Sequence, residues 1–405
     1  MAVSDNSKKS EQIKPKEQFD FFHDERVRSV LYQLLTAAAV ALVAWFLISN
    51  TSKNLEARGM HTGFSFLNVA AGFDSYFKLI PNEAGVGTYG RIFVIGALNT
   101  LYVSLLAIVA STILGFFIGI LRLSSNWLVS KVALAYVEIF RNTPLLIQIV
   151  FWYISVFSLL PRVRNSIDLS GGLELVLLNN RGLYLPWPVP GDSLWLTGIA
   201  LIVAIIAVCV FRRWAKASQD KTGQIVPTII PSCLLLIVLP GAVYLLTGMP
   251  LEWDVPKLAG LNFSGGATLP PSFVTLLVAL SAYHASYTAE MVRAGILSVN
   301  SGQYDAARSL GLKQGRLMSL VIIPQAMPAI VPPLISNWMS TIKNSSLAIA
   351  IGYPDLVSLF MQTSLNQAGY AIELVSMTMA FYMFVSLIIS GLLNIYNKRI
   401  QLVER

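Results

Sequence analysis

The segment from Ser301 to Pro324 reads SGQYDAARSLGLKQGRLMSLVIIP and lies between two long apolar stretches of the chain. Its residues predict a short helix that ends in a turn. Asn300 or Ser301 can cap the N-terminus, because their side-chain oxygens accept hydrogen bonds from the first free backbone N–H groups. Asp305 lies where the helix dipole favours an acid, and Gly311 suits a left-handed residue at the C-terminal end. A compact helix held between two apolar stretches is suited to docking in a groove of another protein.

The composition of the whole chain indicates a membrane protein. Of its 405 residues, 55% are hydrophobic and only 12% are charged, and the mean hydropathy is +0.63. Soluble domains carry about 25% charged residues, so most of this chain is expected to lie in lipid. The net charge of +8 does not indicate nucleic-acid binding, because the basic residues fall in short loops between apolar stretches rather than in one patch.

Apolar stretches of membrane-spanning length predict eight helices. Lysine and arginine accumulate in the N-terminal tail, in three connecting loops and at the C-terminal end. Eight spans place all of these segments on one side, which the positive-inside rule identifies as the cytoplasm. Both termini are therefore expected to be cytoplasmic, and residues 1–28 are expected to form a solvated tail. The predicted spans are 30–49, 93–121, 143–160, 194–211, 228–247, 272–289, 326–342 and 374–395.

The sequence excludes or disfavours several kinds of active site. It lacks the GxxxxGK[ST] pattern, so the chain is not expected to bind ATP by itself. None of the three histidines lies near a cysteine, and neither a metal site nor a catalytic set is expected. All 21 acidic residues lie outside the predicted spans or at their margins. This pattern counts against a proton-coupled carrier, and less strongly against a sodium site built from carbonyls.

The spacing Asp305-Ala306-Ala307-x3-Gly311-x9-Val321-x-Ile323-Pro resembles the EAA loop of bacterial ABC importer permeases, usually Glu-Ala-Ala-x3-Gly-x9-Ile-x-Leu-Pro. Asp replaces Glu, Val replaces Ile and Ile replaces Leu, and each change keeps the chemical type. The resemblance implies that this helix docks on a separate ATPase subunit and transmits its closure to the membrane domain. The residues that the resemblance assigns to this coupling are Gly302, Gln303, Asp305, Ala306, Ala307, Arg308 and Gly311.

Three further stretches resemble the polar amino-acid permeases of that superfamily. Residues 138–146 read EIFRNTPLL and resemble the signature ExFRGTPLL, with Asn142 in place of glycine. Residues 290–295 (ExxRxG) and 343–347 (KNSSL) match patterns of the same group. The additional first span and the long middle segment resemble the larger permeases of the general L-amino acid and the glutamate/glutamine/aspartate transport systems.

The resemblance implies an all-α polytopic membrane protein of the type I ABC importer (MetI-like) fold, with a five-helix core and about three accessory transmembrane helices. It implies import of L-amino acids, either acidic or amide-bearing or over a broad polar range, by alternating access. An ion-coupled secondary amino-acid transporter is the alternative. The expected parts are a cytoplasmic tail (1–28), a first span with a periplasmic loop (29–91), the first core part (92–160), an insert with two accessory spans and periplasmic loops (161–271), and the second core part (272–405) with the coupling loop (301–324).

The expected partners follow from the same resemblance. A second homologous permease, a dimer of ATPase subunits and a periplasmic substrate-binding protein would complete the transporter in the bacterial inner membrane. ATP and magnesium would be bound by the ATPase, and no cofactor is expected in this chain. Pairing with an identical or a different permease stays open. It also stays open whether this chain or its partner holds a membrane substrate site.

The predicted span 326–342 suggests a substrate contact near its C-terminal end. Four prolines at positions 324, 328, 332 and 333 remove backbone hydrogen bonds and predict a broken helix, and broken helices commonly line substrate sites. Lys343 could meet a substrate carboxylate or could instead extend to the interface and cap the helix. Its polar neighbours Asn344, Ser345 and Ser346 are candidates for the same pathway.

Other polar residues in the spans have two possible roles. His284 and Tyr287 share a helical face, where a hydrogen bond between helices is the first interpretation and a pathway role the second. Asn99 and Thr100 are interpreted in the same way. Arg141 is expected to pair with Glu138 or with loop carbonyls. The spacing Gly115-x-x-x-Gly119 permits close helix packing.

Overall fold

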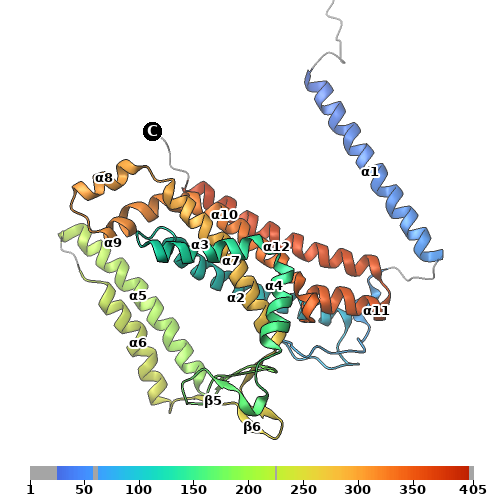
Figure 1. Ribbon diagram of the computed structural model, residues 1–405, viewed down its shortest axis with the longest axis horizontal. Coiled ribbons are helices and arrows are strands. Elements are labelled where there is room, and N and C mark those ends of the chain that lie inside the picture. The colour runs from blue at the N-terminus through green and yellow to red at the C-terminus, as the bar shows by residue number, and fades with distance from the viewer. Residues whose placement is uncertain (1–24, 58–62, 224–225, 401–405) are drawn as a thin grey trace, which may run out of the picture. The chain divides into compact units, whose positions relative to one another are not determined.

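The computed structural model describes residues 25–57, 63–223 and 226–400. The chain divides into two units, Met1–Phe64 with Gly369–Glu373, and Ser65–Ala368 with Leu374–Arg405. In the first unit, helix α1 (Glu25–Ala57) is apolar and long enough to cross a membrane, and its described side chains are almost all exposed (Figure 1). It contains the predicted span 30–49. Most of the predicted tail, residues 1–24, lies outside the described residues.

The second unit is built around two long helices that pack along each other, α2 (Tyr89–Leu121) and α7 (Pro271–Leu297). Two glycines on α2 allow the close approach. A Cβ atom at Gly115 would lie 2.3 Å from Cβ of Thr288, and one at Gly119 would lie 2.8 Å from a backbone oxygen of α7. The helices can therefore touch through their backbones, as small residues permit in membrane proteins.

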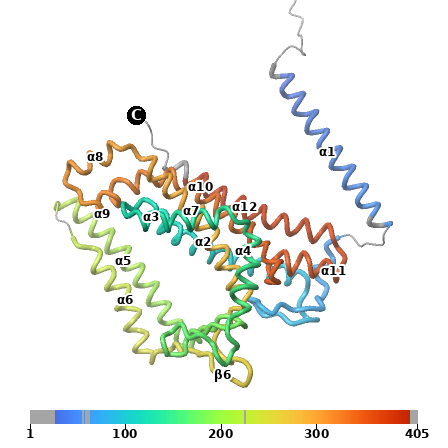
Figure 2. The backbone as a smooth tube through the Cα atoms, viewed as in Figure 1, coloured from blue at the N-terminus to red at the C-terminus, as the bar shows by residue number. Residues whose placement is uncertain are grey.

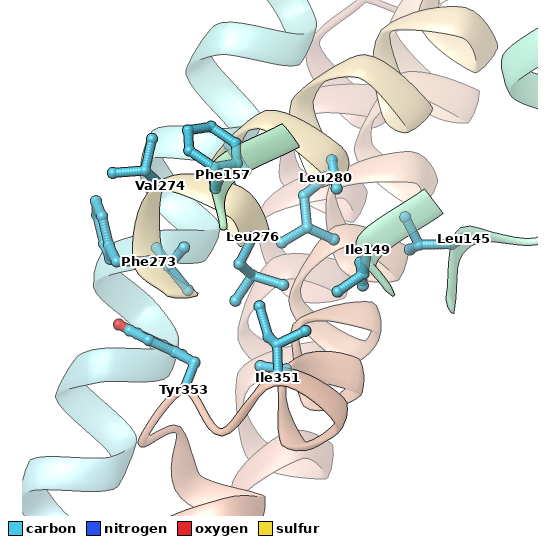
Figure 3. Close-up of a cluster of buried hydrophobic side chains, with 13 residues drawn as sticks. Leu145, Ile149, Phe157, Phe273, Val274, Leu276, Leu280, Ile351 and Tyr353 are labelled. Atoms are coloured by element: carbon cyan, nitrogen blue, oxygen red, sulfur yellow. The ribbon is translucent and has the colours of Figure 1, made fainter. Parts of the chain in front are cut away.

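A buried cluster of side chains holds further elements against α2 and α7 (Figure 3). On one side of it the 3-10 helix η5 (Ser345–Ile351) and the residues after it contribute Ile351 and Tyr353. The rings of Tyr353 and Phe273 have centroids 5.9 Å apart. The helices that pack against α7 are α3 (Trp127–Asn142), α4 (Leu145–Phe151) and α10 (Ile323–Asn344).

Among the described residues, six helices are long and apolar enough to cross a membrane, and the broken pair α3–α4 raises the number to seven. The prediction of eight spans therefore needs two corrections. Residues 143–160 are only the second half of a broken helix, because α4 and the π-helix η2 (Trp152–Phe157) depart from α3 at 103°. Helix α7 contains the predicted span 272–289 but is not one of the six, because it carries many polar side chains, several of which are buried against neighbouring helices.

Proline acts differently in these two regions. Pro144 restricts the preceding residue, and Thr143 has an extended backbone that ends α3. In α10, by contrast, the helix continues through Pro328, Pro332 and Pro333. The predicted break at these prolines is therefore wrong, and the helix changes to a 3-10 turn only after Asn344. Packed neighbours allow a helix at membrane depth to tolerate the lost backbone hydrogen bonds.

The insert between α4 and α7 contains strands that the all-α prediction did not include. Helices α5 (Leu194–Thr222) and α6 (Ile229–Leu246) form an antiparallel pair. Strands β4 (Trp187–Pro190) and β5 (Leu251–Asp254) pair at the base of that helical hairpin, and β6 (Lys257–Ala259) pairs with β7 (Asn262–Ser264). A four-stranded antiparallel sheet has the order β1 (Ile167–Asp168), β2 (Leu177–Asn179), β3 (Gly182–Leu185) and β8 (Ala267–Leu269).

The strand β8 leads directly into α7, and α7 leads into α8, a path that can be followed in Figure 2. The sheet of the insert and the loop after α7 therefore lie at opposite ends of one 27-residue helix. The remaining elements of the described residues are η1 (Ser65–Asn68), η3 (Val163–Asn165), α8 (Ser301–Ser309), α9 (Gln314–Leu317), η4 (Met318–Ile322), η6 (Leu356–Thr363), α11 (Ser364–Ala368) and α12 (Ala371–Ile400).

Candidate functional site

A pocket of about 460 Å³ lies between α7 and α10. Helix α7 contributes mainly aromatic and imidazole side chains, and α10 contributes hydroxyl and amide groups. Three residues predicted from the sequence, His284, Tyr287 and Asn344, meet here. The lining residues are Tyr283, His284, Tyr287, Met291, Pro333, Ser336, Asn337, Ser340 and Asn344.

His284 and Asn337 join the two helices at the pocket. His284 is 1% exposed, and its Nδ1 atom lies 2.8 Å from Oδ1 of Asn337. The amide nitrogen of Asn337 donates to the carbonyl oxygen of His284 at 3.2 Å and to the hydroxyl of Thr288 at 3.1 Å. Asn344 places its amide nitrogen 3.3 Å from Nε2 of His284. These bonds fit a neutral imidazole with the proton on Nδ1, which donates at Nδ1 and accepts at Nε2.

Asn337 was not among the residues predicted from the sequence. The available signal was the stripe of polar residues at positions 336, 337, 340 and 344, which recurs every three to four residues in an otherwise apolar helix. That spacing places the polar groups on one face of α10. The sequence could not indicate that this face meets His284.

Two tyrosines of α7 form the aromatic side of the pocket. The hydroxyl oxygens of Tyr283 and Tyr287 lie 3.1 Å apart. The guanidinium carbon of Arg141 lies 5.3 Å from the ring centroid of Tyr287, within the range of a cation–π interaction. Arg141 therefore brings a positive charge to the edge of the pocket.

Arg141 belongs to a charged cluster around Glu290. One carboxylate oxygen of Glu290 accepts a hydrogen bond from Arg122 and lies 3.8 Å from Nη1 of Arg141, and the other accepts a bond from Arg293 at 3.3 Å. One carboxylate thus faces three guanidinium groups. The prediction that Arg141 pairs with Glu138 is wrong, because the Glu138 carboxylate accepts a bond from its own helix while Arg141 lies against α7.

The predicted coupling residues lie on α8 and in the turn after it. The side chain of Asn300 accepts a hydrogen bond from the backbone N–H of Gly302 at 2.8 Å and so caps the helix. Gly311 has a φ of +73°, which fits the predicted left-handed residue. The coupling residues that are exposed are Gly302, Gln303, Asp305, Ala306, Arg308 and Gly311.

Ala307 lies inward and connects α8 to the pocket helices. It is 3% exposed and packs in a buried cluster with residues of α7, α9, η4 and α10. Leu310, by contrast, is 81% exposed at the tip of the loop. It was not among the coupling residues predicted from the sequence. A large apolar residue directly before the helix-ending glycine was the available signal. The other members of the buried cluster are Val292, Ile296, Leu317, Ile322, Ala326 and Ile330.

The remaining predicted pathway residues do not line this pocket. Lys343 is exposed, and its side chain makes no hydrogen bond or ion pair among the described residues. The hydroxyls of Ser345 and Ser346 donate to backbone carbonyls of the preceding turn. Asn99 and Thr100 are buried and bond to the backbone of the segments around positions 77 and 354–356. These bonds attach α2 to its neighbours.

The structure also contains a buried carboxylate that the sequence reasoning did not identify. Asp355 lies between η5 and η6 and is fully buried. One of its oxygens accepts a bond from the backbone N–H of Ser358 at 2.8 Å, and the other has no partner among the described residues. Burial raises the pKa of the Asp355 carboxyl to about 7. Asp355 is outside the predicted spans, as the sequence indicated, but its segment folds back into the interior.

The fold and the site together indicate the membrane subunit of a transport system. Membrane-length helices surround a polar pocket, and a helical loop is fixed to one end of the helices that line it. Comparison with known proteins identifies the system. Residues 221–402 match the family described as "Binding-protein-dependent transport system inner membrane component".

Three curated relatives match over nearly the whole chain. The chain is 48% identical over 384 residues to the putative amino-acid ABC transporter permease protein YhdX of Escherichia coli, which covers 95% of this chain and 97% of the relative. It is 43% identical over 383 residues to the general L-amino acid transport system permease protein AapQ of Rhizobium johnstonii, with 95% and 94% covered. It is 40% identical over 411 aligned residues to the glutamate/glutamine/aspartate/asparagine transport system permease protein BztB of Rhodobacter capsulatus, with 95% and 96% covered.

The chain belongs to the family of amino-acid ABC transporter permeases. This membership confirms the polar amino-acid permease resemblance and the type I importer fold class drawn from the sequence. The chain is a multi-pass inner-membrane protein and not an enzyme, because ATP hydrolysis belongs to a partner subunit in such systems. An importer of this kind works with that ATPase and with a substrate-binding protein.

Proposed function

We propose that this chain imports polar L-amino acids, with acidic or amide side chains or over a broad range, by alternating access. One observation carries the proposal. Ala307 of the coupling helix α8 packs in the same buried cluster as Val292 and Ile296 of α7 and Ile330 of α10. Helices α7 and α10 are the two that line the pocket, so a push on α8 reaches the pocket through close-packed side chains.

The coupling proceeds through rigid parts. Closure of the ATPase subunits moves α8, and the buried cluster transmits this movement to the C-terminal end of α7 and the N-terminal end of α10. The bonds between His284 and Asn337 keep the two helices together at the pocket. The pocket therefore moves as a unit and opens alternately to either side of the membrane.

The chemistry of the pocket supports an amino-acid substrate. Amide, hydroxyl and imidazole groups can bind both the carboxylate and the ammonium group of an amino acid. None of the residues that line the pocket carries a carboxylate, and Arg141 adds positive charge at its edge. This arrangement favours acidic and amide side chains over cationic ones. The names of AapQ and BztB refer to general L-amino acids and to glutamate, glutamine, aspartate and asparagine, which supports the same substrate class.

The proposed assembly contains a second homologous permease, a dimer of ATPase subunits that binds ATP and magnesium, and a periplasmic substrate-binding protein. Ser336 and Ser340 of the pocket lining are exposed, so the second permease can complete the wall. The basic loops support a cytoplasmic position for α8 and for both termini. The sheet of the insert, at the other end of α7, then faces the periplasm.

Reconstituted vesicles test the proposal. Uptake of radiolabelled glutamate or glutamine into proteoliposomes with the ATPase and the binding protein should require internal ATP, stop with vanadate and survive an uncoupler. Competition with a panel of unlabelled amino acids should rank acidic and amide side chains above lysine and arginine. Uptake that collapses with the ion gradient and ignores vanadate would instead support the secondary transporter.

A further inference from the structure

A second pocket, of about 560 Å³, lies on the insert and not on the pathway helices. It forms where three short segments meet: η3, the turn between β2 and β3, and the turn between β6 and β7. We call it the arginine pocket, because three arginines line it. Its lining residues are Arg162, Val163, Arg164, Asn165, Asn180, Arg181 and Leu261.

Hydrogen bonds hold the arginine pocket in shape. The buried side chain of Asn179 donates to the hydroxyl of Ser166 at 2.9 Å and accepts from the backbone N–H of Arg181 at 2.8 Å. The backbone N–H of Asn180 donates to the carbonyl of Pro161 at 3.0 Å. The β2–β3 turn is thus fixed to the segment that carries the other two arginines, so the pocket is preformed.

The positive charge of the arginine pocket is not neutralised. Arg162, Arg164 and Arg181 are exposed, and none takes part in an ion pair among the described residues. Among the described residues, the guanidinium group of Arg181 donates to the uncharged side chain of Asn262. The nearby acid Asp168 is occupied by its own turn, where it accepts bonds from three backbone N–H groups. These three guanidinium groups are therefore available to an acidic ligand.

The arginine pocket is mechanically connected to the pathway. Strand β3, which follows Arg181, pairs with β8, and β8 leads into the first residues of α7. Leu183 of β3 and Leu269 of β8 pack against the buried cluster that contains Phe273 and Leu276 of α7. A ligand that presses on this sheet therefore acts, through the sheet, on the N-terminal end of the helix that carries His284. Since α7 has 27 residues, this end lies about 40 Å from the end that carries α8.

Three arginines close together are unusual on the periplasmic side of a membrane protein. In the orientation of the proposed function, on which this inference rests, the sheet faces the periplasm, where permease loops usually contain few basic residues. Guanidinium groups bind carboxylates through paired, charge-assisted hydrogen bonds. The matched family is described as binding-protein-dependent, so a protein must deliver the substrate on this side. Only Val163, which is buried, and Leu261 give the lining apolar character, which does not suit a lipid with acyl chains.

We propose that the arginine pocket receives acidic side chains of the substrate-binding protein and holds it over the insert when it delivers the substrate. The contact is electrostatic and lies at the edge of a larger interface. Charges in that position govern mainly the association rate and the salt dependence of a complex. The pocket thus raises the affinity of the permease for the binding protein, and the sheet passes the docking force to α7.

The test uses the complete transporter in nanodiscs and the purified binding protein that stimulates its ATPase activity. The triple variant Arg162→Glu, Arg164→Glu, Arg181→Glu should need about tenfold more binding protein for half-maximal stimulation. Its basal ATP hydrolysis and its rate at saturating binding protein should stay the same. Lys257→Glu, an exposed charge reversal on β6 of the same insert that does not line the pocket, is the matched control and should leave the half-maximal concentration unchanged.

Salt and lipid composition separate the possible outcomes. The half-maximal concentration should rise with ionic strength in the wild type and rise less in the triple variant. An unchanged half-maximal concentration in the triple variant overturns the docking proposal while leaving the importer intact. A change in basal activity that depends on anionic lipid, with no change in binding-protein affinity, also overturns it and assigns the pocket to lipid headgroups. If no binding protein stimulates the wild-type transporter, the proposed function fails together with this inference.

Discussion

Nδ1 of His284 lies 2.8 Å from Oδ1 of Asn337, although the two residues are 53 positions apart in the chain. The pair joins α7 to α10 at the wall of the pocket, and both side chains are buried. Buried polar groups are costly when they lose their partners, so the bond constrains how the two helices pack. Each of these helices also contacts the coupling helix through the cluster around Ala307.

Replacing Asn337 with alanine should therefore destabilise the protein by about 1–3 kcal/mol, because Nδ1 of His284 loses its partner and the hydroxyl of Thr288 loses one of its two. Thermal unfolding of the purified permease in detergent measures the effect. Ser340→Ala is the matched control, since Ser340 lines the same pocket but its hydroxyl donates only to its own helix. Equal stabilities of the two variants would contradict this role for Asn337.

Gly311→Val should abolish uptake and the association with the ATPase while the membrane protein stays folded. Gly311 has a φ of +73°, where a β-branched residue is strained, but no atom lies within 4 Å of a Cβ atom built there. The substitution thus alters the direction of the loop without a core clash. Gly315→Val, in the same loop with an ordinary helical backbone and equally open surroundings, should retain co-purification with the ATPase. Normal ATPase binding by Gly311→Val would show that the loop has been misassigned.

Gly115→Leu should prevent stable packing of α2 against α7. A Cβ atom at this position would lie 2.9 Å from the carbonyl oxygen of Ala285 and closer still to Thr288, so the helices would have to separate. Overpacking of this kind typically costs about 1–3 kcal/mol or more. Gly198→Leu on α5, where no atom lies within 4 Å, should have little effect. Size-exclusion profiles and thermal unfolding of the two variants give the comparison.

Glu290→Gln should destabilise the end of α7 that leads into the coupling loop. The side chain of Arg122 is only 8% exposed and would lose its charged partner, while three guanidinium groups would remain close together. Hydrogen bonds to charged groups contribute about 1.5–3 kcal/mol, and the partial exposure of Glu290 reduces the effect. Glu138→Gln, whose carboxylate bonds only to Asn142, is the control and should unfold at the wild-type temperature.

Asp355 predicts a pH dependence of stability. Its pKa is raised from 3.8 to about 7 by burial, so the folded protein keeps a proton that the unfolded chain releases. This contribution is complete below about pH 4 and is lost as the pH rises to about 7, a decrease of about 4 kcal/mol. Asp355→Asn keeps the oxygen that caps η6 and should remove this part of the dependence. Denaturant titrations of both proteins at several pH values measure it. A wild-type stability independent of pH in this range would contradict the burial of a protonated carboxyl.

The class and the family of this protein could be predicted from the sequence because both depend on local patterns. Apolar stretches of about 20 residues identify helices in lipid wherever the rest of the chain lies. The spacing from Asp305 to Pro324 predicts a coupling loop, and the helix at Ser301–Ser309 ends as that spacing predicted. The positions of the acidic residues counted against a proton-coupled carrier, and the lack of an ATP-binding motif counted against ATP binding by this chain. Both features can be read directly from the order of the residues.

Three predictions about secondary structure were wrong or incomplete, because hydropathy alone does not show bends, short strands or tolerated prolines. Residues 127–142 form a short amphipathic helix, so its hydropathy alone does not mark it as part of a span. The chain bends after this helix, at Pro144. The strands of the insert have only two to four residues each and are stabilised by pairing with one another, so no single strand has a strong pattern. The prolines of α10 stay within a helix because neighbouring helices surround it.

The sequence by itself therefore determined that the chain is a membrane permease and where most of its apolar helices lie, and it predicted which loop serves the ATPase. Only the tertiary structure decided which polar groups meet. His284 bonds to Asn337 and Asn344, Glu290 lies beside Arg122, Arg141 and Arg293, and Asp355 is buried although it follows a short connection. The physical reason is that hydropathy and helix caps depend on neighbours in sequence, whereas these contacts depend on how distant helices pack.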